Sequence, residues 1–424
     1  MTSESSYAFL KGRNIRVLIS CRIIWGLAQA LFTPYFSLFA LAQQGMTVEL
    51  LGLAISMKAV GTAIVAPLAG YLADSVGRKK MIFAGTSLHA VSYLFYFAAT
   101  DFKMIFIGSM IEGISIVHFP ALMALTQDSL TKGRRGLGLS ATISLQALPS
   151  LISPLIGGIF AGQLGVDFAV RIGLASSAVV GLAVAFIRLN FLEETLEPKK
   201  HETEHENLSS IIKKSYKDVF AVLREYNALK GLVALCVVDT LFSAIAAPFW
   251  VVYGEMIVGL TTAEWGLSEV TATGVYMLVM FFSGRLADRY GSKKVMLTNL
   301  LIAPAINLSF IFCQDFHQIL AFRIMLAVQN AFIMPAATAL IADIVPRKQR
   351  GRAIAAIGWQ PVIISLGAVS NGFLRFPSYF AGSLLSGYIY SIDVRYPWFL
   401  LAMAYAIESA ICYFLIRQPE KPAD

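Results

Sequence analysis

Charged residues are scarce in this sequence: Asp, Glu, Lys and Arg make up 14% of the 424 residues, and hydrophobic residues make up 57%. Because a soluble domain has roughly 25% charged residues, this composition excludes an ordinary water-soluble core. Short segments of alternating polarity are missing too, which argues against an outer-membrane barrel. The sequence therefore predicts an all-α integral membrane protein.

Long apolar runs take the place of the missing charges. Each has roughly 20 residues, enough to cross a ~30 Å hydrocarbon layer as a helix. The runs begin near Ile15, Leu50, Met81, Met104, Leu137, Phe168, Leu229, Leu267, Val295, Ile319, Ala353 and Trp398. They predict twelve transmembrane helices.

Cysteine is also rare. The four cysteines are Cys21, Cys236, Cys313 and Cys412. All lie inside apolar runs at no metal-ligand spacing, so they indicate small buried hydrophobes and no disulfide framework. The sequence has neither the nucleotide-binding phrase G-x-x-x-x-G-K-S/T nor a paired acid, base and nucleophile near one membrane interface. We therefore expect no cofactor, no bound metal and no enzymatic activity.

Basic residues outnumber acidic ones, 34 to 26, which gives a net charge of +8. Their placement follows membrane topology rather than nucleic-acid binding. If the amino terminus is cytoplasmic, the only basic residues in the loops on the non-cytoplasmic side are Lys103, Arg171 and Arg395. The positive-inside rule predicts this distribution. This pattern predicts a multi-pass protein of the cytoplasmic membrane, surrounded by lipid, with both termini in the cytoplasm.

One phrase occurs twice, half a chain apart. Residues 70–80 read GYLADSVGRKK and residues 284–294 read GRLADRYGSKK. Each copy ends one apolar run and precedes the next. Other landmarks keep nearly the same offset, among them Pro34 with Pro248 and Pro120 with Pro335. The repeat predicts two pseudo-symmetric six-helix bundles.

A polar segment, residues 192–227, divides the chain near its middle. It predicts a cytoplasmic linker between a first bundle, residues 1–191, and a second bundle, residues 228–424. The spacing of apolar residues in its later part would suit an amphipathic helix on the membrane surface. Within it, residues 201–205 match the letters of a zinc-protease helix, but a charged linker offers neither the apolar packing nor the third ligand that such a site needs.

Two six-span units joined by a charged loop, with one phrase at both turns between second and third spans, resemble the major facilitator superfamily. The resemblance covers essentially the whole chain. Its signature is met by Gly70, Leu72, Asp74, Gly77, Arg78 and Lys79, and again by Gly284, Leu286, Asp288, Arg289, Gly291 and Lys293. The resemblance implies a secondary transporter in which two bundles rock about a solute site between them.

The resemblance also implies a cytoplasmic gate. In the family, the aspartate of the phrase caps the start of the eleventh span, and the arginine four residues on meets an acid that ends the fourth span. Here these residues would be Asp74, Arg78 and Asp128. The second-half counterparts are Asp288 and Asp343, and Ser292 removes the arginine there, so that latch is expected to be weaker.

The phrase also has a simpler interpretation. Gly77 and Gly291 allow a tight turn, and the lysines hold that turn in the cytoplasm. An aspartate that ends an apolar span is costly unless it is paired or placed at a helix amino terminus. Turn stability and topology alone would therefore also explain the phrase.

The fifth span contains a phrase that bears on the direction of transport. Residues 153–158 read SPLIGG and resemble the G-P-x-x-G-G phrase of the family's proton-coupled drug exporters, with Ser153 replacing the first glycine. Pro154 bends the span, and Gly157 and Gly158 let helices approach closely. The phrase favours export by antiport, with ordinary helix packing as the alternative.

The fourth span departs from the exporter pattern. Exporters usually carry an arginine four residues before a mid-span glycine, but here Ser109 has that place and Glu112 precedes Gly113. The missing arginine favours solute uptake by symport or facilitated diffusion.

Ionisable residues inside spans are costly unless they face a cavity or a partner. Glu112 and Asp239 fall near mid-membrane and are the best proton-site candidates, because a carboxylate drawn from water can load and release protons near neutral pH. Arg22 is a candidate countercharge or anion ligand. A structural ion pair is the alternative for each. Lys58 and Arg323 lie nearer the outside, and we expect them to snorkel to the outer interface.

Further polar and aromatic residues complete the candidate set. His118 could relay protons or be a satisfied polar residue, and Glu408 is expected to pack or form an interface. An aromatic and amide wall would suit an amphiphilic or cationic solute, although aromatics near span ends also belong to interfacial belts. The candidate wall residues are Trp25, Gln29, Tyr35, Phe249, Trp250, Tyr253, Gln146 and Gln329.

Together these observations predict a secondary active transporter that acts as a monomer by alternating access. Its partners would be a small solute and protons, and its activity proton-coupled export of an amphiphilic or drug-like solute, as in multidrug efflux. One alternative is uptake by proton symport or facilitated diffusion. Another is a membrane sensor or lipid-handling protein that moves no soluble substrate; the small linker argues against a sensor.

The asymmetry between the two signature copies leads to a first test. Asp74→Asn is expected to lower transport more than Asp288→Asn, because only the first copy keeps the arginine that completes the latch. Initial transport rates of both variants, reconstituted at equal density, measure the difference. Equal losses would contradict an asymmetric latch.

Overall fold

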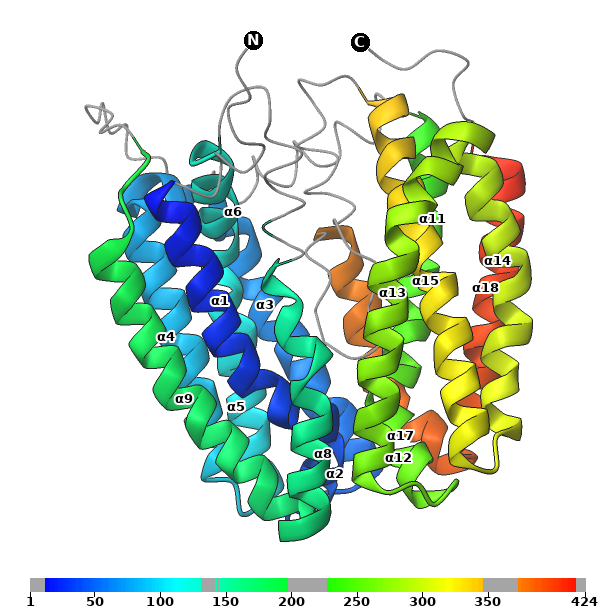
Figure 1. The fold of residues 1–424 in the computed structure, drawn as a ribbon, viewed down its shortest axis with the longest axis horizontal. Helices are drawn as coiled ribbons and strands as arrows, with labels where there is room; N and C mark the ends of the chain where they lie inside the picture. Colours follow the sequence, from blue (N-terminus) through cyan, green and yellow to red (C-terminus); the bar gives the residue numbers. More distant parts are fainter. Residues whose placement is uncertain (1–11, 131–141, 143–144, 197–226, 346–372, 417–424) are drawn as a thin grey trace.

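The computed structural model describes residues 12–130, 142, 145–196, 227–345 and 373–416. Apart from one isolated bridge between Gln44 and Asp101, these residues form helices and connecting turns. Figure 1 shows two helical bundles side by side, which converge at the end that carries α2 and α12 and diverge towards the other end. We call the diverging end the basic end, because Arg13 begins α1 there and Arg78 begins α4 there. The other is the opposite end.

The first bundle contains the helices before residue 192. In chain order they are α1 (Arg13–Phe32), η2 (Thr33–Tyr35), α2 (Phe36–Leu41), α3 (Val48–Val76), α4 (Arg78–Phe97), α5 (Phe102–Ser115), η3 (Ile116–His118), α6 (Phe119–Asp128), η4 (Leu148–Leu151), α8 (Ser153–Leu164) and α9 (Val166–Phe191).

The second bundle contains the helices from residue 227 onward. They are α11 (Asn227–Ala246), η5 (Ala247–Phe249), α12 (Trp250–Met256), α13 (Thr262–Tyr290), α14 (Ser292–Ser309), η6 (Phe310–Phe312), α15 (Phe316–Ile344), η7 (Phe373–Arg375), α17 (Phe376–Ile392) and α18 (Tyr396–Leu415).

Eight helical segments of the described chain are long and apolar enough to cross a membrane. They form the first, second, fourth, sixth, seventh, ninth, tenth and twelfth spans. Of the other four, α8 and α17 have only 12 and 17 residues. The observed helices begin within a few residues of the predicted apolar runs, and the predicted pair of pseudo-symmetric six-helix bundles is confirmed. The predicted starts at Leu137 and Ala353 lie outside the described residues, and the domain boundaries stay a prediction.

Proline interrupts the first span of each bundle at the same place. Pro34 lies in η2 and Pro248 in η5, each between two α-helical pieces. Proline has no N–H to donate to the preceding turn, so the α-helical hydrogen bonds cannot continue through it. The fourth and tenth spans differ: Pro120 follows η3, whereas Pro335 lies inside the continuous helix α15.

Two pairs of helices join the bundles, α3 with α17 and α8 with α13. In the first pair, glycines on both helices let the backbones touch. A Cβ added to Gly52 of α3 would lie 2.7 Å from the carbonyl oxygen of Ser383. A Cβ added to Gly387 of α17 would lie 2.0 Å from the carbonyl oxygen of Val48. Real side chains do not fit at such distances, so this seam requires glycine.

The second pair repeats the arrangement. A Cβ on Gly158 of α8 would lie 2.3 Å from the carbonyl oxygen of Thr262, and one on Gly266 of α13 would lie 2.5 Å from that of Pro154. The Tyr35 hydroxyl donates to the Pro154 carbonyl at 2.7 Å. Both seams involve the first turns of α3 and α13, which start at the opposite end, and they close the molecule there.

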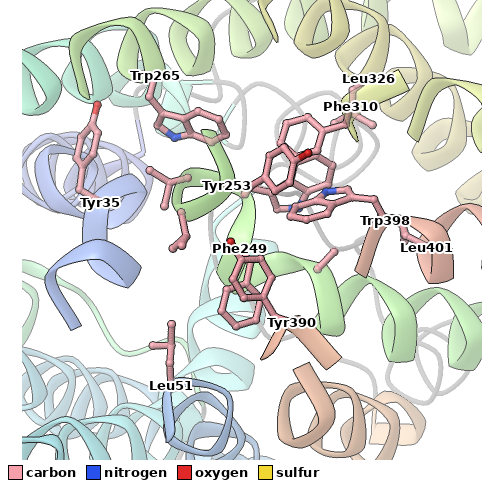
Figure 2. Close-up of a cluster of buried hydrophobic side chains, with 14 of the residues drawn as sticks. Tyr35, Leu51, Phe249, Tyr253, Trp265, Phe310, Leu326, Tyr390, Trp398 and Leu401 are labelled. Atoms are coloured by element: carbon pink, nitrogen blue, oxygen red, sulfur yellow. The ribbon is translucent and has the colours of Figure 1, made fainter. Parts of the chain in front are cut away.

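Aromatic side chains fill the second bundle near the same end (Figure 2). The Trp250 ring contacts Phe310 and Phe322, with centroids 4.6 and 5.6 Å away, and Phe310 contacts Trp398 at 4.9 Å. This packing makes the opposite end of the second bundle a solid hydrophobic core.

The glycine seam can be tested within one helix. Gly266→Ala is expected to separate α13 from α8, because its Cβ would overlap the Pro154 carbonyl oxygen. Gly274→Ala, two turns further along α13, is the matched control, since its Cβ would have only Leu151 Cδ2, at 3.9 Å, within contact distance.

Spin labels at Lys103→Cys and Arg395→Cys, in a background without native cysteines, would measure the separation of the bundles at the opposite end. Both positions are exposed. The distance distribution should shift to longer values in Gly266→Ala and stay unchanged in Gly274→Ala. Identical distributions in both variants would show that glycine contact does not hold the seam.

Candidate functional site

The crossing of α3 and α5 places two charged side chains opposite each other. A Cβ on Gly61 would lie 2.4 Å from the Met110 carbonyl oxygen, and one on Gly113 would lie 2.2 Å from the Lys58 carbonyl oxygen. The Thr62 hydroxyl donates to the Lys58 carbonyl at 2.9 Å. The backbones are therefore in contact, and side chains on either flank of the crossing must meet.

Lys58 and Glu112 form an ion pair at this crossing. The Nζ–Oε1 distance is 2.5 Å, and the two side chains are 18% and 16% exposed. The other carboxylate oxygen of Glu112 accepts a hydrogen bond from the Tyr96 hydroxyl at 2.9 Å. Tyr379, on α17 of the second bundle, is an electrostatic neighbour of both charges. The pair thus faces the interface between the bundles.

A chain of polar side chains leads from Glu112 to α1. His89 Nε2 lies 3.9 Å from Glu112 Oε1 and 2.7 Å from the Tyr93 hydroxyl. Gln29 Nε2 donates to that hydroxyl at 2.6 Å, and Arg22 Nη1 donates to Gln29 Oε1 at 2.9 Å. The hydrogen bonds from His89 to Arg22 polarise one another in a low dielectric, and Glu112 acts on this chain through the 3.9 Å approach of its carboxylate to His89.

The second bundle has its own ion pair at the same interface. Asp239 Oδ2 on α11 lies 3.5 Å from Arg375 Nη2 in η7, and Ser243 Oγ donates to Asp239 Oδ1 at 3.3 Å. Arg375 precedes Tyr379 by four residues, about one helical turn. The residues from Arg375 to Tyr379, where the described part of the eleventh span begins, therefore lie between the Lys58–Glu112 and Asp239–Arg375 pairs.

The countercharges differ from those expected from the sequence. Arg22 was a candidate countercharge or anion ligand, but Glu112 pairs with Lys58 and Asp239 with Arg375. The expectation that Lys58 snorkels to the outer interface is wrong. The Lys58 ammonium group is neutralised by the buried Glu112 carboxylate on the adjacent helix, so it does not need to reach the membrane surface.

Arg323 does not reach the outer interface either. It is 3% exposed, and its Nη2 pairs with Glu269 Oε1 of α13. The guanidinium also lies over the Trp265 ring, 5.1 Å from the centroid. This buried pair ties α15 to α13, away from the two interface pairs.

Trp25 and His118 are buried in the first bundle. Trp25 Nε1 donates to the Ser177 carbonyl at 3.1 Å, and its ring contacts His89 with centroids 5.2 Å apart. His118 Nδ1 lies 2.6 Å from the Ser115 carbonyl oxygen. Trp25 thus borders the polar chain, whereas the His118 contact is local to η3.

The remaining wall candidates lie elsewhere. Trp250 belongs to the aromatic core near the opposite end. Gln329 accepts from Asn307 Nδ2 at 3.4 Å with its side chain and from Asn299 Nδ2 at 2.8 Å with its backbone carbonyl, linking α15 to α14. Gln146 is half-buried just before η4. Their roles in solute binding stay predictions.

The signature turns have the geometry that the glycines imply. Gly77 has φ 100° and Gly291 has φ 91°, a region that residues with a Cβ rarely adopt. Arg78 pairs with Asp128 and donates to Thr195 Oγ1 at 2.9 Å. The predicted contact between Arg78 and the end of the fourth span is therefore present.

The remaining signature residues lie on helices that the structure describes, but it does not describe the segment that Asp74 is expected to contact. Gly70 and Asp74 lie on α3, Gly284 and Asp288 on α13, and Asp343 near the end of α15. The expected contact of Asp74 falls at the start of the eleventh span, within residues 346–372, which lie outside the described residues. The gating roles of these five residues stay predictions.

The first residues after α9 fold back onto the first signature turn. Glu194 Oε2 accepts from the Lys79 amide at 3.0 Å, and Glu193 Oε1 pairs with Arg13 Nη1 at 3.0 Å. Asn14 Oδ1 accepts from the Glu193 amide at 2.8 Å. The exit from the first bundle is thus anchored at the basic end. The predicted amphipathic helix and the match at 201–205 lie outside the described residues.

The fifth-span phrase makes two close contacts. Pro154 lies in the first turn of α8, after the 3₁₀ turn η4. A Cβ on Gly157 would lie 2.0 Å from the Leu31 carbonyl oxygen of α1, and Gly158 meets α13 as described above. The two glycines therefore let α8 touch both its own bundle and the other one.

Sequence reasoning missed His89 and the site tyrosines Tyr93, Tyr96 and Tyr379, and it missed Lys58 and Arg375 as partners. His89 and Tyr93 stand four residues apart on one helix, a spacing that brings side chains together. That spacing could have identified the polar chain. No local pattern pairs Lys58 with Glu112, because they are 54 residues apart.

Comparisons with known proteins agree with this architecture. The family model of the Major Facilitator Superfamily matches residues 18–268 and 249–424. The multi-drug resistance efflux pump PmrA homolog of Lactococcus lactis is 26% identical over 384 residues, 89% of this chain and 89% of that protein. Multidrug resistance protein MdtG of Citrobacter koseri is 24% identical over 338 residues, 78% of this chain and 80% of that protein.

Solved structures share the fold. The crystal structure of a D-xylose-proton symporter superposes with a TM-score of 0.70 at 15% identity, over 97% of this chain and 99% of that chain. At this identity the likeness concerns the arrangement of helices.

The Lys58–Glu112 pair can be examined by a double-mutant cycle. Lys58→Met and Glu112→Gln are each expected to destabilise the protein by about 3–5 kcal/mol, because each leaves one buried charge unpaired. The double variant should be more stable than at least one single variant. Unfolding in detergent by denaturant titration measures all three.

The exposed pair of Asp393 and Arg395 provides the control for that cycle. Its N–O distance is 2.9 Å, but Arg395 is more than half exposed, and surface pairs contribute little. Additive losses for Lys58 and Glu112, as at the surface pair, would show that the two charges do not depend on each other.

Proposed function

The chain belongs to the major facilitator superfamily, and we propose that it is a secondary transporter that exports an amphiphilic solute in exchange for protons. We place it in the cytoplasmic membrane with the basic end in the cytoplasm. One of the relatives named above is called a multi-drug resistance efflux pump and the other a multidrug resistance protein, and both align with most of this chain. The observation that carries the proposal is the Lys58–Glu112 pair, buried in one bundle and facing the other.

The two seams support alternating access. They join the bundles near the opposite end, where backbone contact through glycine leaves no room for a solute. Separation at these seams and closure at the signature turns would expose the interface pairs to the other side of the membrane. Rigid bundles that rock in this way keep the site itself intact.

Protonation of Glu112 provides the coupling step. A proton that binds Glu112 removes its negative charge and leaves the Lys58 ammonium without its counterion. An unpaired buried charge is unfavourable, so α3 would move until Lys58 reaches water or another acceptor. Because α3 also carries Gly52 of the seam, loading the proton would loosen the contact between the bundles.

The solute class follows from what surrounds the pair. Trp25, Tyr93 and Tyr96 are buried aromatic side chains packed beside the polar chain. Glu112 would offer its negative charge to a solute that displaces Lys58. Aromatic faces and a carboxylate suit a hydrophobic molecule with a cationic group. Lipophilic cations are therefore the solutes we propose to test first.

Uptake by symport is the second candidate. The fourth-span position where exporters usually carry arginine is Ser109, and the only charge near it at the α3–α5 crossing, among the described residues, is the Lys58–Glu112 pair. A carboxylate that must be protonated before the solute binds would serve a symporter equally well.

Reconstituted vesicles with an imposed pH gradient distinguish the two directions. With a fluorescent lipophilic cation as the probe, antiport should move the probe in the direction opposite to the proton flux. Glu112→Gln should lower proton-driven accumulation of the probe at least tenfold, while movement of the probe down its own concentration gradient continues. Asp393→Asn, at the surface ion pair with Arg395, is the control and should behave as the wild type. Probe movement in the same direction as the protons would exclude antiport.

A further inference from the structure

Glu408 is a buried acid that the site described above does not use. It lies on α18 of the second bundle and is 1% exposed. Its Oε1 has no hydrogen-bond partner among the described residues. The sequence led us to expect a packing or an interface role for Glu408, and the position of the side chain inside the bundle agrees with packing.

The charged and titratable neighbours of Glu408 belong to the interface pair of the second bundle. They are Asp239 and Cys236 on α11 and Arg375 in η7. On its own helix, Tyr405 lies nearly one turn earlier and is also an electrostatic neighbour. On α14, Lys293 contacts the Tyr413 carbonyl at 3.0 Å, further towards the basic end.

The charges of this cluster do not balance. Asp239 and Glu408 carry two negative charges when ionised, and Arg375 carries one positive charge. The full cluster would then bury one uncompensated negative charge, which is strongly unfavourable in a bundle interior. One bound proton makes the cluster neutral.

The geometry indicates which carboxyl holds the proton. Asp239 has the Arg375 guanidinium at 3.5 Å and the Ser243 hydroxyl at 3.3 Å. Both contacts favour its ionised form. Glu408 has an oxygen without a partner, and a neutral carboxyl tolerates that situation far better than a carboxylate does.

We propose that Glu408 is a proton-binding carboxyl of the second bundle, loaded while Arg375 pairs with Asp239 and emptied when Arg375 turns to Glu408. In the emptying step the Glu408 O–H bond breaks and the proton passes to water. The guanidinium exchanges one carboxylate for the other, and the water that takes up the proton also hydrates the Asp239 carboxylate that the guanidinium leaves. No other bond changes. The proposal rests on the proposed function, since it assigns a second group to proton coupling.

The position of Arg375 connects this step to the movement of the bundles. Arg375 immediately precedes α17, and α17 forms the seam with α3 through Gly387. A shift of α17 that opens the seam also shifts the guanidinium relative to α11 and α18. Glu408 lies seven residues before Leu415, roughly 10 Å from the end of α18, so its proton would leave towards the basic end.

Infrared difference spectroscopy of the purified protein tests the site without any transport assay. Alkalinisation of the wild type should remove a carboxylic-acid C=O band, and this change should be absent from Glu408→Gln. Asp239→Asn should also lack it, because Arg375 would then pair with Glu408 and keep it ionised. Glu264→Gln, which changes a half-buried acid at the start of α13, should show the same band change as the wild type.

A transport measurement completes the test. In vesicles, Glu408→Gln should lose proton-driven accumulation of the lipophilic cation at least tenfold and keep solute exchange at equal pH on both sides. A wild-type band in folded Glu408→Gln would overturn the assignment, whatever the solute proves to be. A wild type that shows the band but moves no solute would refute the proposed function and leave the proton site standing.

Discussion

Contact between helix backbones at glycine is the constraint on which this molecule depends. Lipid provides no hydrophobic drive for helices to associate, so they hold together where small residues allow close approach. Gly61 and Gly113 bring α3 against α5, and this crossing alone makes an ion pair between Lys58 and Glu112 possible. The same type of contact joins the bundles. Close backbone approach at glycine therefore produces both the polar site and the seam that controls access to it.

The two halves use their common architecture differently. Both signature turns rest on a glycine of positive φ, and both first spans break at a proline. The interior charges, however, follow no repeat: Glu112 of the first bundle pairs within that bundle, and Arg375 pairs with Asp239 beside an extra acid. Duplication therefore accounts for the framework, and later divergence of single side chains accounts for the chemistry of the site.

The sequence was sufficient for the fold and insufficient for the ion pairs. Apolar runs of membrane length, the repeated phrase and the prolines are local patterns, and they led correctly to two bundles. The contact of Arg78 with Asp128 was implied by the family resemblance that the phrase carries, and it is present. The partner of a buried charge is set by how helices cross. Lys58 and Arg323 were expected to snorkel because they lie nearer the outside along their spans. Their partners, Glu112 and Glu269, are far away in sequence and on other helices.

The short stretch that leaves α9 has a consequence for how the chain can be divided. Glu193 and Glu194 hold the start of α1 and the first signature turn, so these residues belong physically to the first bundle although their composition resembles the linker. Two separately expressed halves could reassemble only if the break spares them. A break beyond residue 196 would keep the contacts of Glu193 and Glu194 with the first bundle. A break at residue 192 would place both residues on the other half and remove these contacts from the first signature turn.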